Sequence, residues 1–206
     1  MYGNHPDMFV SLCFDGDMLL GQAFFLRKRI KNKGICSWVT QLVVHNKYRK
    51  RKIGSKLLQS AWGFSNYYAW GLATANALTL KTLESVTWRE INTSVISQNI
   101  DVLEQLIEDI PFANTGGISI GENKSQIFTN FFPELDHINH SEEFQIYSLK
   151  LGDIEHGHEW LAFTFASQKM IYTDDKFKSF LDFSDVQLKD AYSRMSMPQQ
   201  AWAKGT

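Results

Sequence analysis

Apolar residues at the start of the chain are gathered into short runs that polar turns separate. The runs cover residues 8–14, 18–30 and 35–44, and the turns between them read Asp15-Gly16-Asp17 and Asn32-Lys33-Gly34. Aspartate, asparagine and glycine tolerate the left-handed backbone of tight turns. The pattern therefore predicts three antiparallel strands joined by hairpins.

After residue 44 the pattern switches between helix and strand. Residues 55–64 repeat apolar side chains at helical spacing, whereas residues 67–75 are largely apolar and predict an internal strand. Asn76 ends that strand, and residues 77–86 predict a second helix. The predicted order is three strands, a loop, a helix, a strand and a helix.

The remainder of the chain is less regular. Residues 95–110 carry an apolar helical face and stop at Pro111, which terminates a helix. Residues 144–151 alternate in polarity and predict a strand, residues 160–165 predict another, and residues 186–195 predict a late helix. The sequence contains no internal repeat.

Composition indicates a packed protein without a membrane span. Hydrophobic residues make up 44% of the 206 positions, and no apolar run reaches the roughly 20 residues that cross a bilayer. The first residues are polar and unlike a signal peptide, so we expect a cytoplasmic protein. Cys13 and Cys36 lie in predicted strands without a metal-type partner, which favours buried free thiols.

Charge divides the chain near residue 90. Residues 1–90 hold 13 lysines and arginines against 5 acids, whereas residues 91–206 hold 8 against 17. A basic first half suits a polyanionic ligand, and the acidic second half could dock on it or attract a cationic substrate. We therefore predict two domains, residues 1–91 and residues 92–206, the second of unknown role.

The most informative segment joins the third predicted strand to the first helix. Its cations are Arg49, Lys50, Arg51, Lys52 and Lys56. The free N–H groups and positive dipole end of a helix favour anions, and Gly54 lets a bound group approach the backbone. The segment predicts a phosphate-binding loop, although an ordinary basic loop before a helix is the alternative. It contains neither G-x-x-x-x-G-K-[ST] nor G-x-G-x-x-G.

Residues 49–54 resemble the pyrophosphate loop of the GNAT acetyltransferase superfamily, whose motif is [Q/R]-x-x-G-x-[G/A]. Arg49 and Gly54 match the motif, and Lys52 stands in place of its first glycine. The flanking pattern, Leu42-x-Val44 before the loop and Leu57-Leu58 after it, is also similar. The strand that ends in Asn76, followed by Leu83-Glu84, resembles the second signature of the family.

The resemblance covers about residues 8–91 and implies a GNAT-like fold of the α+β type. Its mixed, mainly antiparallel sheet would splay between the strands that end at Val44 and Ala75, so that pantetheine could pair with exposed backbone. Family members usually begin with a strand and two helices that cover the acceptor site. This chain lacks them, so either it is truncated or something else covers that side. The second half would form a C-terminal α+β extension.

The resemblance also implies acetyl-CoA as co-substrate and a set of contacts with it. These contacts are Leu42, Val43, Val44, Arg49, Lys50, Arg51, Lys52, Ile53, Gly54, Ser55 and Asn76. The first three would meet pantetheine and the acetyl group, the loop would hold the phosphates, and Asn76 would meet the pantetheine arm. The backbone N–H of Val44 would be the oxyanion donor.

A general base and a general acid are harder to find. Many family members have a glutamate before the loop, but residues 37–41 contain no carboxylate. A tyrosine acid is often found where this chain has Leu83. His45 is the base candidate, because histidine titrates near neutral pH, with an exposed loop histidine as the alternative.

Four histidines in the acidic half raise the question of a metal. They lie in His137-x-x-His140 and His156-Gly157-His158-Glu159, and neither spacing is that of H-E-x-x-H. Turn residues flank them, which favours solvated loop histidines over zinc ligands. We predict no metal site.

The combined pattern predicts an acyl-CoA-dependent N-acetyltransferase that transfers an acetyl group to an amine. One alternative is a non-catalytic acyl-CoA-binding or regulatory module, which would keep the loop without the acid and base. Another is a basic nucleic-acid-binding protein, although its cations lack interleaved aromatic residues. A homodimer, the acceptor amine and the role of residues 92–206 stay open.

Overall fold

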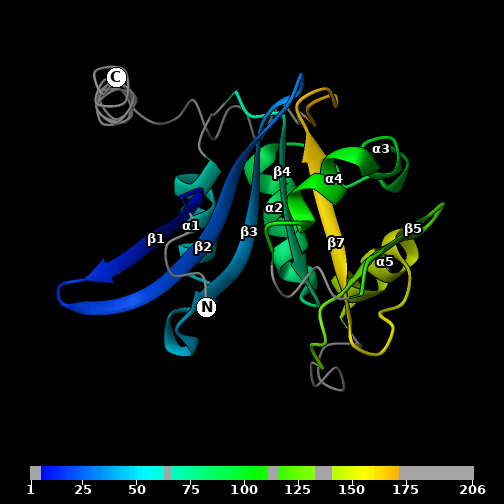
Figure 1. Ribbon diagram of the computed structural model, residues 1–206. Helices are drawn as coiled ribbons and strands as arrows, with labels where there is room; N and C mark the ends of the chain where they lie inside the picture. Colours follow the sequence, from blue (N-terminus) through cyan, green and yellow to red (C-terminus); the bar gives the residue numbers. More distant parts are fainter. Residues whose placement is uncertain (1–5, 63–65, 111–115, 133–140, 172–206) are drawn as a thin grey trace, which may run out of the picture. The chain divides into compact units, whose positions relative to one another are not determined.

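The computed structural model describes residues 6–62, 66–110, 116–132 and 141–171 (Figure 1). The strands are β1 (Met8–Asp15), β2 (Met18–Ile30), β3 (Gly34–Val44), β4 (Ala69–Thr74), β5 (Ile118–Gly121), β6 (Lys124–Phe128) and β7 (His158–Phe165). The helices are the short 3-10 turn η1 (Asn46–Tyr48), α1 (Ile53–Trp62), α2 (Ala77–Thr87), α3 (Thr93–Ser97), α4 (Ile100–Ile107) and α5 (Glu142–Leu151). All of them belong to one compact unit that ends at Met170.

The strands form one sheet in the order β1-β2-β3-β4-β7-β6-β5. Only β3 and β4 run parallel; the other neighbours are antiparallel. The predicted meander, the internal position of β4 and the mixed, mainly antiparallel sheet are confirmed. Strand β7 from the second half of the chain pairs with β4 from the first half, so both halves build the same sheet. A division of roles between the halves stays a prediction.

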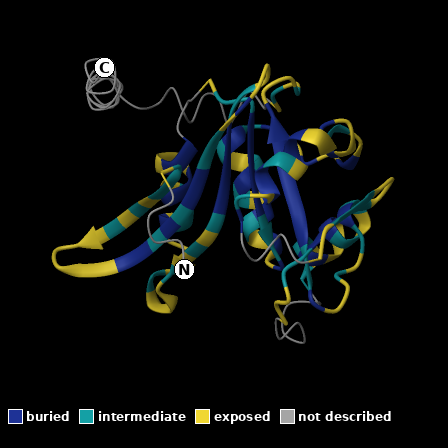
Figure 2. Cartoon of the chain, in the orientation of Figure 1, coloured by how far each residue is buried: buried dark blue, intermediate teal, exposed yellow. Residues whose placement is uncertain are grey.

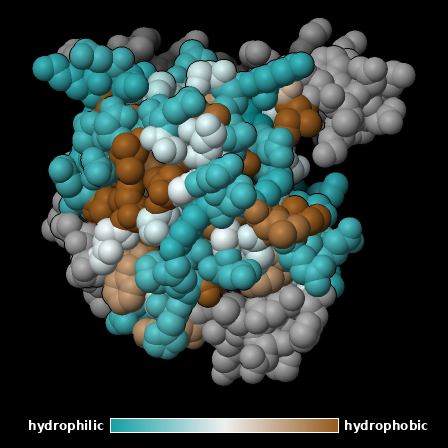
Figure 3. All heavy atoms as spheres, turned by 90° about the vertical axis from the view of Figure 1, so that its right-hand side faces the viewer, coloured by the Kyte–Doolittle hydropathy of each residue, from teal (hydrophilic) through white to brown (hydrophobic). Residues whose placement is uncertain are grey.

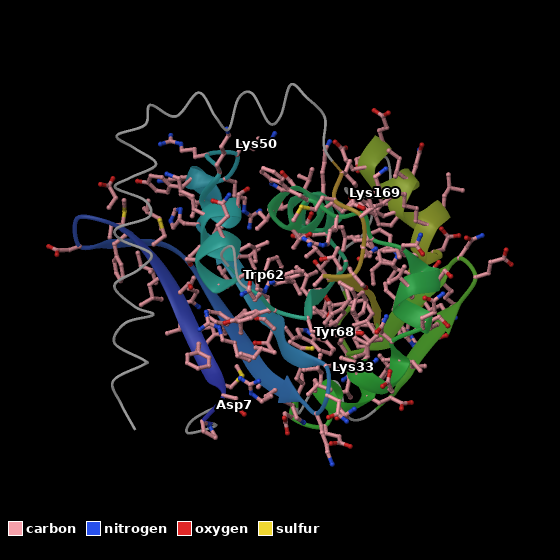
Figure 4. The ribbon with its side chains drawn as sticks, turned by 90° about the horizontal axis from the view of Figure 1, so that it is seen from above. Asp7, Lys33, Lys50, Trp62, Tyr68 and Lys169 are labelled. Atoms are coloured by element: carbon pink, nitrogen blue, oxygen red, sulfur yellow. The ribbon has the colours of Figure 1, made fainter. Side chains whose placement is uncertain are left out.

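Helices cover both faces of the sheet, and neighbouring residues of β2 show which helix lies on which face. The Arg27 guanidinium donates to the carbonyl of Ala61 in α1 at 2.9 Å. Lys28 instead donates to the carbonyl of Gln105 in α4 at 2.6 Å and forms a salt bridge with Asp109 at 2.7 Å. Successive strand residues point to opposite faces, so α1 and α4 lie on opposite sides (Figure 4).

The centre of the sheet is buried, whereas the hairpin of β1 and β2 is exposed at its tip (Figure 2). The Ser60 hydroxyl of α1 donates to the Ser11 hydroxyl of β1 at 2.8 Å, so the neighbours of Ser11, Val10 and Leu12, point to the α4 side. Both are about half exposed, at 47% and 50%. Helices α3 and α4 therefore cover only part of this face of the sheet.

A missing side chain at Gly71 lets two aromatic rings meet in the core. The Trp38 and Phe163 rings make an edge contact, with centroids 5.3 Å apart. A Cβ on Gly71, which pairs with Trp38 on one side and Phe163 on the other, would lie 2.4 Å from Phe163 ring atoms. Packing across β3, β4 and β7 therefore depends on a residue without a side chain.

The prediction of a strand over residues 144–151 is wrong, because this segment belongs to helix α5. Ser141 caps it by accepting from the N–H of Phe144 at 3.1 Å. Phe144, Tyr147 and Leu151 are its buried residues, at helical spacing. A short segment whose apolar residues fit both periods is ambiguous, and the serine cap followed by two glutamates decides for helix.

Two further predictions needed correction. The single helix over residues 95–110 is divided into α3 and α4, and Asn99, which is buried, stands at the break. The hairpin of β5 and β6 was not predicted, because its strands are only four and five residues long. At the helix break, Asn99 has a partner far away in the sequence, since the Tyr68 hydroxyl donates to it at 2.5 Å.

Other expectations concern single residues. Cys36 is fully buried and Cys13 partly exposed, and both are free thiols. The late helix over residues 186–195 lies outside the described residues. No helix in the described part of the chain is long and apolar enough to cross a membrane.

On the side of the molecule that ends in β5, hydrophobic side chains lie among hydrophilic ones (Figure 3).

Candidate active site

Strands β3 and β4 separate after a short paired stretch. Residues 36–39 pair with residues 69–72, and beyond Val39 and Leu72 the two strands share no further pairs. A bulge lies at this point, because Phe24 pairs with Gln41 and Phe25 with Val39, which leaves Thr40 without a partner in the register. A bulge bends its strand, here while the pairing of β3 with β2 continues on both sides of it. The splayed central strands predicted from the sequence are therefore present (Figure 1).

The split holds a cleft of about 400 Å³. Its lining residues are Val39, Thr40, Gln41, Leu42, Leu72, Ala73, Thr74, Ala75, Asn76, Thr79, Phe131 and Glu159. Both separated strand ends contribute, together with the start of α2 and two residues from the second half of the chain. Half of the lining residues are polar and half apolar, and the volume is within the range of sites for small ligands.

The edge of β3 inside the split presents backbone groups. The N–H of His45 donates to the carbonyl of Leu20 in β2 at 2.9 Å. Hydrogen-bonded residues alternate along an antiparallel pair, so Leu42 and Val44 turn their N–H and carbonyl groups away from β2. The Val44 carbonyl accepts from Arg49 Nε at 3.3 Å. The N–H groups of Leu42 and Val44 therefore face the open side of β3.

The loop after β3 has an unusual backbone. Lys50 and Lys52 adopt left-handed conformations, with φ of 61° and 62°. Such conformations favour glycine, since a Cβ crowds the following carbonyl. Lys52 is the residue that replaces the first glycine of the loop motif. This chain therefore departs from the motif at Lys52, where the left-handed backbone favours glycine.

The five loop cations surround the N-terminus of α1. All of them are exposed, and among the described residues none forms a salt bridge. Lys50 is labelled at this end of α1 in Figure 4. The first turn of α1 contains no acidic residue. Positive charges next to the positive end of a helix repel it, so a bound anion would relieve an unfavourable arrangement.

Gly54 is the second residue of α1. A Cβ there would lie 3.9 Å from side-chain atoms of Leu42 and Val44, which is ordinary contact. The protein fold does not need a glycine at this position, although glycine weakens a helix. A role for Gly54 in binding a ligand stays a prediction.

Two predicted site residues have local partners. Asn76 lines the cleft, and its side chain caps α2 by accepting from the N–H of Leu78 at 3.0 Å. His45 is exposed and does not line the cleft; its Nδ1 accepts from the N–H of Lys47 at 3.3 Å. Val43 is 45% exposed and also lies outside the cleft lining. The loop and Leu42 are near the split, whereas His45 sits beside η1.

Sequence reasoning missed Glu159 as a site residue. It is the second residue of β7, pairs with Ile127 of β6 and lines the cleft. Burial raises the pKa of its carboxyl, while the nearby Thr129 side chain and Ala75 backbone lower the pKa to a smaller extent. The available signal was a carboxylate next to the apolar run of residues 160–165, but the sequence could not show that β7 lies beside β4.

Other chemistries have less support in the described residues. No group of three or more histidine, cysteine or acidic side chains in that part of the chain could hold a metal ion. His137 and His140 lie outside it. Burial raises the pKa of the Cys36 thiol to about 12, which makes a thiolate nucleophile unfavourable. Leu83 is buried in the core rather than at the cleft.

No family model matches the sequence, and no curated protein matches it. Among solved structures, the chain is similar to Arabidopsis thaliana Naa50 in complex with the bisubstrate analogue CoA-Ac-MVNAL, with 14% identity, a TM-score of 0.36, and coverage of 75% of this chain and 71% of that one. It is also similar to the NatC complex bound to Gag peptide and CoA, with 17% identity, a TM-score of 0.32, and coverage of 38% and 54%. Likeness at this level assigns no residue and no activity to the chain.

Proposed function

We propose that this protein is an acyl-CoA-dependent N-acetyltransferase, with acetyl-CoA as co-substrate and an amine as acceptor. The observation that carries the proposal is the split between β3 and β4, which opens beside a cationic loop and the N-terminus of a helix. One ligand with an amide-rich arm and a polyphosphate end would satisfy both features at once.

The arm of that ligand would lie in the split. The N–H groups of Leu42 and Val44 face the open side of β3, and pantetheine carries amide groups that can pair with them. A ligand that completes an open strand edge gains hydrogen bonds that the free protein leaves to water. The acetyl thioester would then lie at the end of the cleft nearest Val44, beside Leu42.

The phosphates would lie at the start of α1. The first N–H groups of a helix, here those of Ile53, Gly54 and Ser55, have no partner within the helix. Arg49, Arg51 and Lys56 would add positive charge around them. Because charged donors bind phosphate oxygens about twice as strongly as neutral ones, the loop would supply most of the affinity for the nucleotide end.

Acetyl transfer needs an amine held against the thioester carbon and a donor for the carbonyl oxygen. Positioning alone can supply about 7–11 kcal/mol of the barrier. The N–H of Val44 would stabilise the negative charge that develops on the carbonyl oxygen. The structure supports this role through the direction of that N–H, which needs no particular side chain.

The first test is the melting temperature with and without acetyl-CoA. A ligand at about 100 times its Kd adds roughly 2.7 kcal/mol of stability. For a chain of this size the expected rise is about 5–11 °C. Gly54→Glu, which places a carboxylate among the phosphate donors, should remove the shift without harming the helix, because acids are favourable in the first turn.

A matched variant is Gln59→Glu, which adds the same charge to an exposed position of α1 away from its first turn. It should keep the acetyl-CoA shift. If the folded protein shows no shift with acetyl-CoA, the proposal is wrong. A shift without turnover on any amine would indicate an acyl-CoA-binding module, and RNA binding with a steep salt dependence would favour the nucleic-acid alternative.

A further inference from the structure

Glu159 contributes a carboxylate to the lining of the cleft. Within the described residues that line it, Glu159 is the one carboxylate, and the others are apolar or carry neutral amides and hydroxyls. It is partly buried, and its strand partner Ile127 is fully buried. A carboxylate in such surroundings loses hydration, which the Thr129 side chain and the Ala75 backbone offset only in part. A perturbed carboxylate in a cleft is a candidate functional group.

The direction of Glu159 follows from its neighbour. The Trp160 ring lies 4.9 Å from the Phe144 ring of α5, and Tyr147 of the same helix donates to Glu84 of α2 at 2.7 Å. Trp160 therefore points to the face that carries α2 and α5. Side chains alternate along a strand, so Glu159 points to the opposite face.

The two faces of the split then differ in chemistry. Helix α1 and its cationic loop lie on the side of Arg27, and α1 contacts α2. Glu159 points to the other side, where α3 and α4 lie. The side of α1 therefore suits an anionic ligand, and the side of α4 suits a cationic one.

We propose that Glu159 takes a proton from a cationic amine that enters the cleft from the α4 side, while acyl-CoA occupies the side of α1. This inference rests on the proposed acetyl transfer. It gives the missing general base to a residue of β7 and names the acceptor class as a protonated primary amine.

The proposed step balances as follows. The Glu159 carboxylate removes one proton from the ammonium, directly or through one water. The nitrogen lone pair then forms a bond to the thioester carbon, and the carbon–sulfur bond breaks. The second proton of the attacking nitrogen passes to the leaving sulfur, which gives the amide and the free thiol. Glu159 returns its proton to water before the next turnover.

The surroundings of Glu159 suit this role. Burial moves its pKa up, toward the pH at which a carboxylate is an effective base. On the adjoining segments, the His158 ring lies 5.2 Å from the Phe128 ring and the His156 ring 4.5 Å from the Phe132 ring. Lys124 of β6 and Glu155 form a salt bridge with each other. Lys81 of α2 forms its salt bridge with Glu143 of α5 rather than with Glu159.

Phe131 extends the acceptor side with an aromatic surface. It lines the cleft together with Glu159 and is 51% exposed. An aromatic ring next to a carboxylate favours an amine that carries an apolar group, and the ring face also attracts the ammonium. We therefore expect phenylethylamine to be a better acceptor than spermidine.

The test compares Glu159→Gln with the wild-type full chain. The probes are acetyl-CoA with phenylethylamine, spermidine or a lysine-containing peptide. Acetyl-CoA binding should stay within about twofold, and kcat should fall by roughly 10²–10⁴. The matched variant Glu155→Gln alters an exposed carboxylate that pairs with Lys124 outside the cleft, and it should keep wild-type turnover.

Two readouts separate proton removal from a structural effect. Trifluoroethylamine is largely neutral at pH 7 and needs no base, so it should restore turnover in Glu159→Gln. The rise of kcat/KM with pH in the wild type should move, in this variant, to the alkaline range set by the amine itself.

The outcomes distinguish the inference from the proposed function. Unchanged turnover in Glu159→Gln, or a loss that the neutral amine does not restore, would overturn the role of Glu159. Binding of acetyl-CoA without turnover on any probe amine would overturn both the role of Glu159 and the acetyltransferase proposal. If the wild type does not bind acetyl-CoA at all, the proposed function itself fails.

Discussion

Replacement of Gly54 by alanine separates the needs of the fold from those of a ligand. The new Cβ would lie 3.9 Å from atoms of Leu42 and Val44, so alanine fits without rearrangement. Alanine at a compatible glycine position stabilises a protein by about 0.4–1 kcal/mol. For a chain of this size, the melting temperature without ligand should rise by about 1–4 °C.

The same methyl group should weaken acetyl-CoA binding. It would stand among the backbone N–H groups proposed to hold the pyrophosphate, and we expect a loss of about tenfold, or 1.4 kcal/mol. At about 100 times the wild-type Kd, the ligand adds roughly 2.7 kcal/mol to the wild type but only about 1.4 kcal/mol to the variant. The order of the melting temperatures should therefore invert when acetyl-CoA is added.

Differential scanning fluorimetry with and without acetyl-CoA checks this inversion. Gly21→Ala is the control, because a Cβ on Gly21 would lie 2.8 Å from the Val43 carbonyl oxygen and 3.1 Å from Leu57 in α1. It should lose about 1–3 kcal/mol whether or not ligand is present. A Gly54→Ala variant that is less stable without ligand, or one that binds acetyl-CoA as tightly as the wild type, would refute the reasoning.

Three other substitutions test single features. Because the pKa of Glu159 is raised in the folded state, its ionisation opposes folding, and wild-type stability should fall as pH rises from the usual carboxyl value through the raised one. Glu159→Gln should therefore melt higher than the wild type at pH 8, with a difference that shrinks toward pH 5; an equal difference at both values would contradict this. Gly71→Ala would press a Cβ against Phe163 and should lose about 1–3 kcal/mol, or about 2–12 °C by thermal melting. Lys52→Gly should gain up to about 1 kcal/mol in chemical denaturation by relieving its left-handed backbone, whereas Lys52→Ala should not.

Local patterns predicted the first half of the fold well. The hairpin turns, the strand before the loop and the helix after it depend on neighbouring residues, and the structure confirms them. The split between β3 and β4 could be expected only from the family resemblance, since periodicity does not show where two strands part. That these features bind acetyl-CoA stays a prediction.

The second half resisted prediction because its structure depends on distant partners. Strand β7 has its neighbours in β4 and β6, and Tyr147 of α5 meets Glu84, which is 63 residues earlier in the chain. Short segments such as β5 have little periodicity of their own. Glu159 was overlooked for the same reason, because only the insertion of β7 beside β4 brings its carboxyl to the cleft.

The position of β7 also has a consequence for synthesis of the protein. Among the described strands it comes last in the chain, yet it lies between β4 and β6 in the sheet. Until residue 165 has left the ribosome, β4 is paired with β3 only, and Trp38 lacks its contact with the Phe163 ring. Contacts so distant in sequence close slowly. A nascent chain would therefore expose its apolar strands for most of its translation, which makes the cleft one of the last parts of the molecule to assemble.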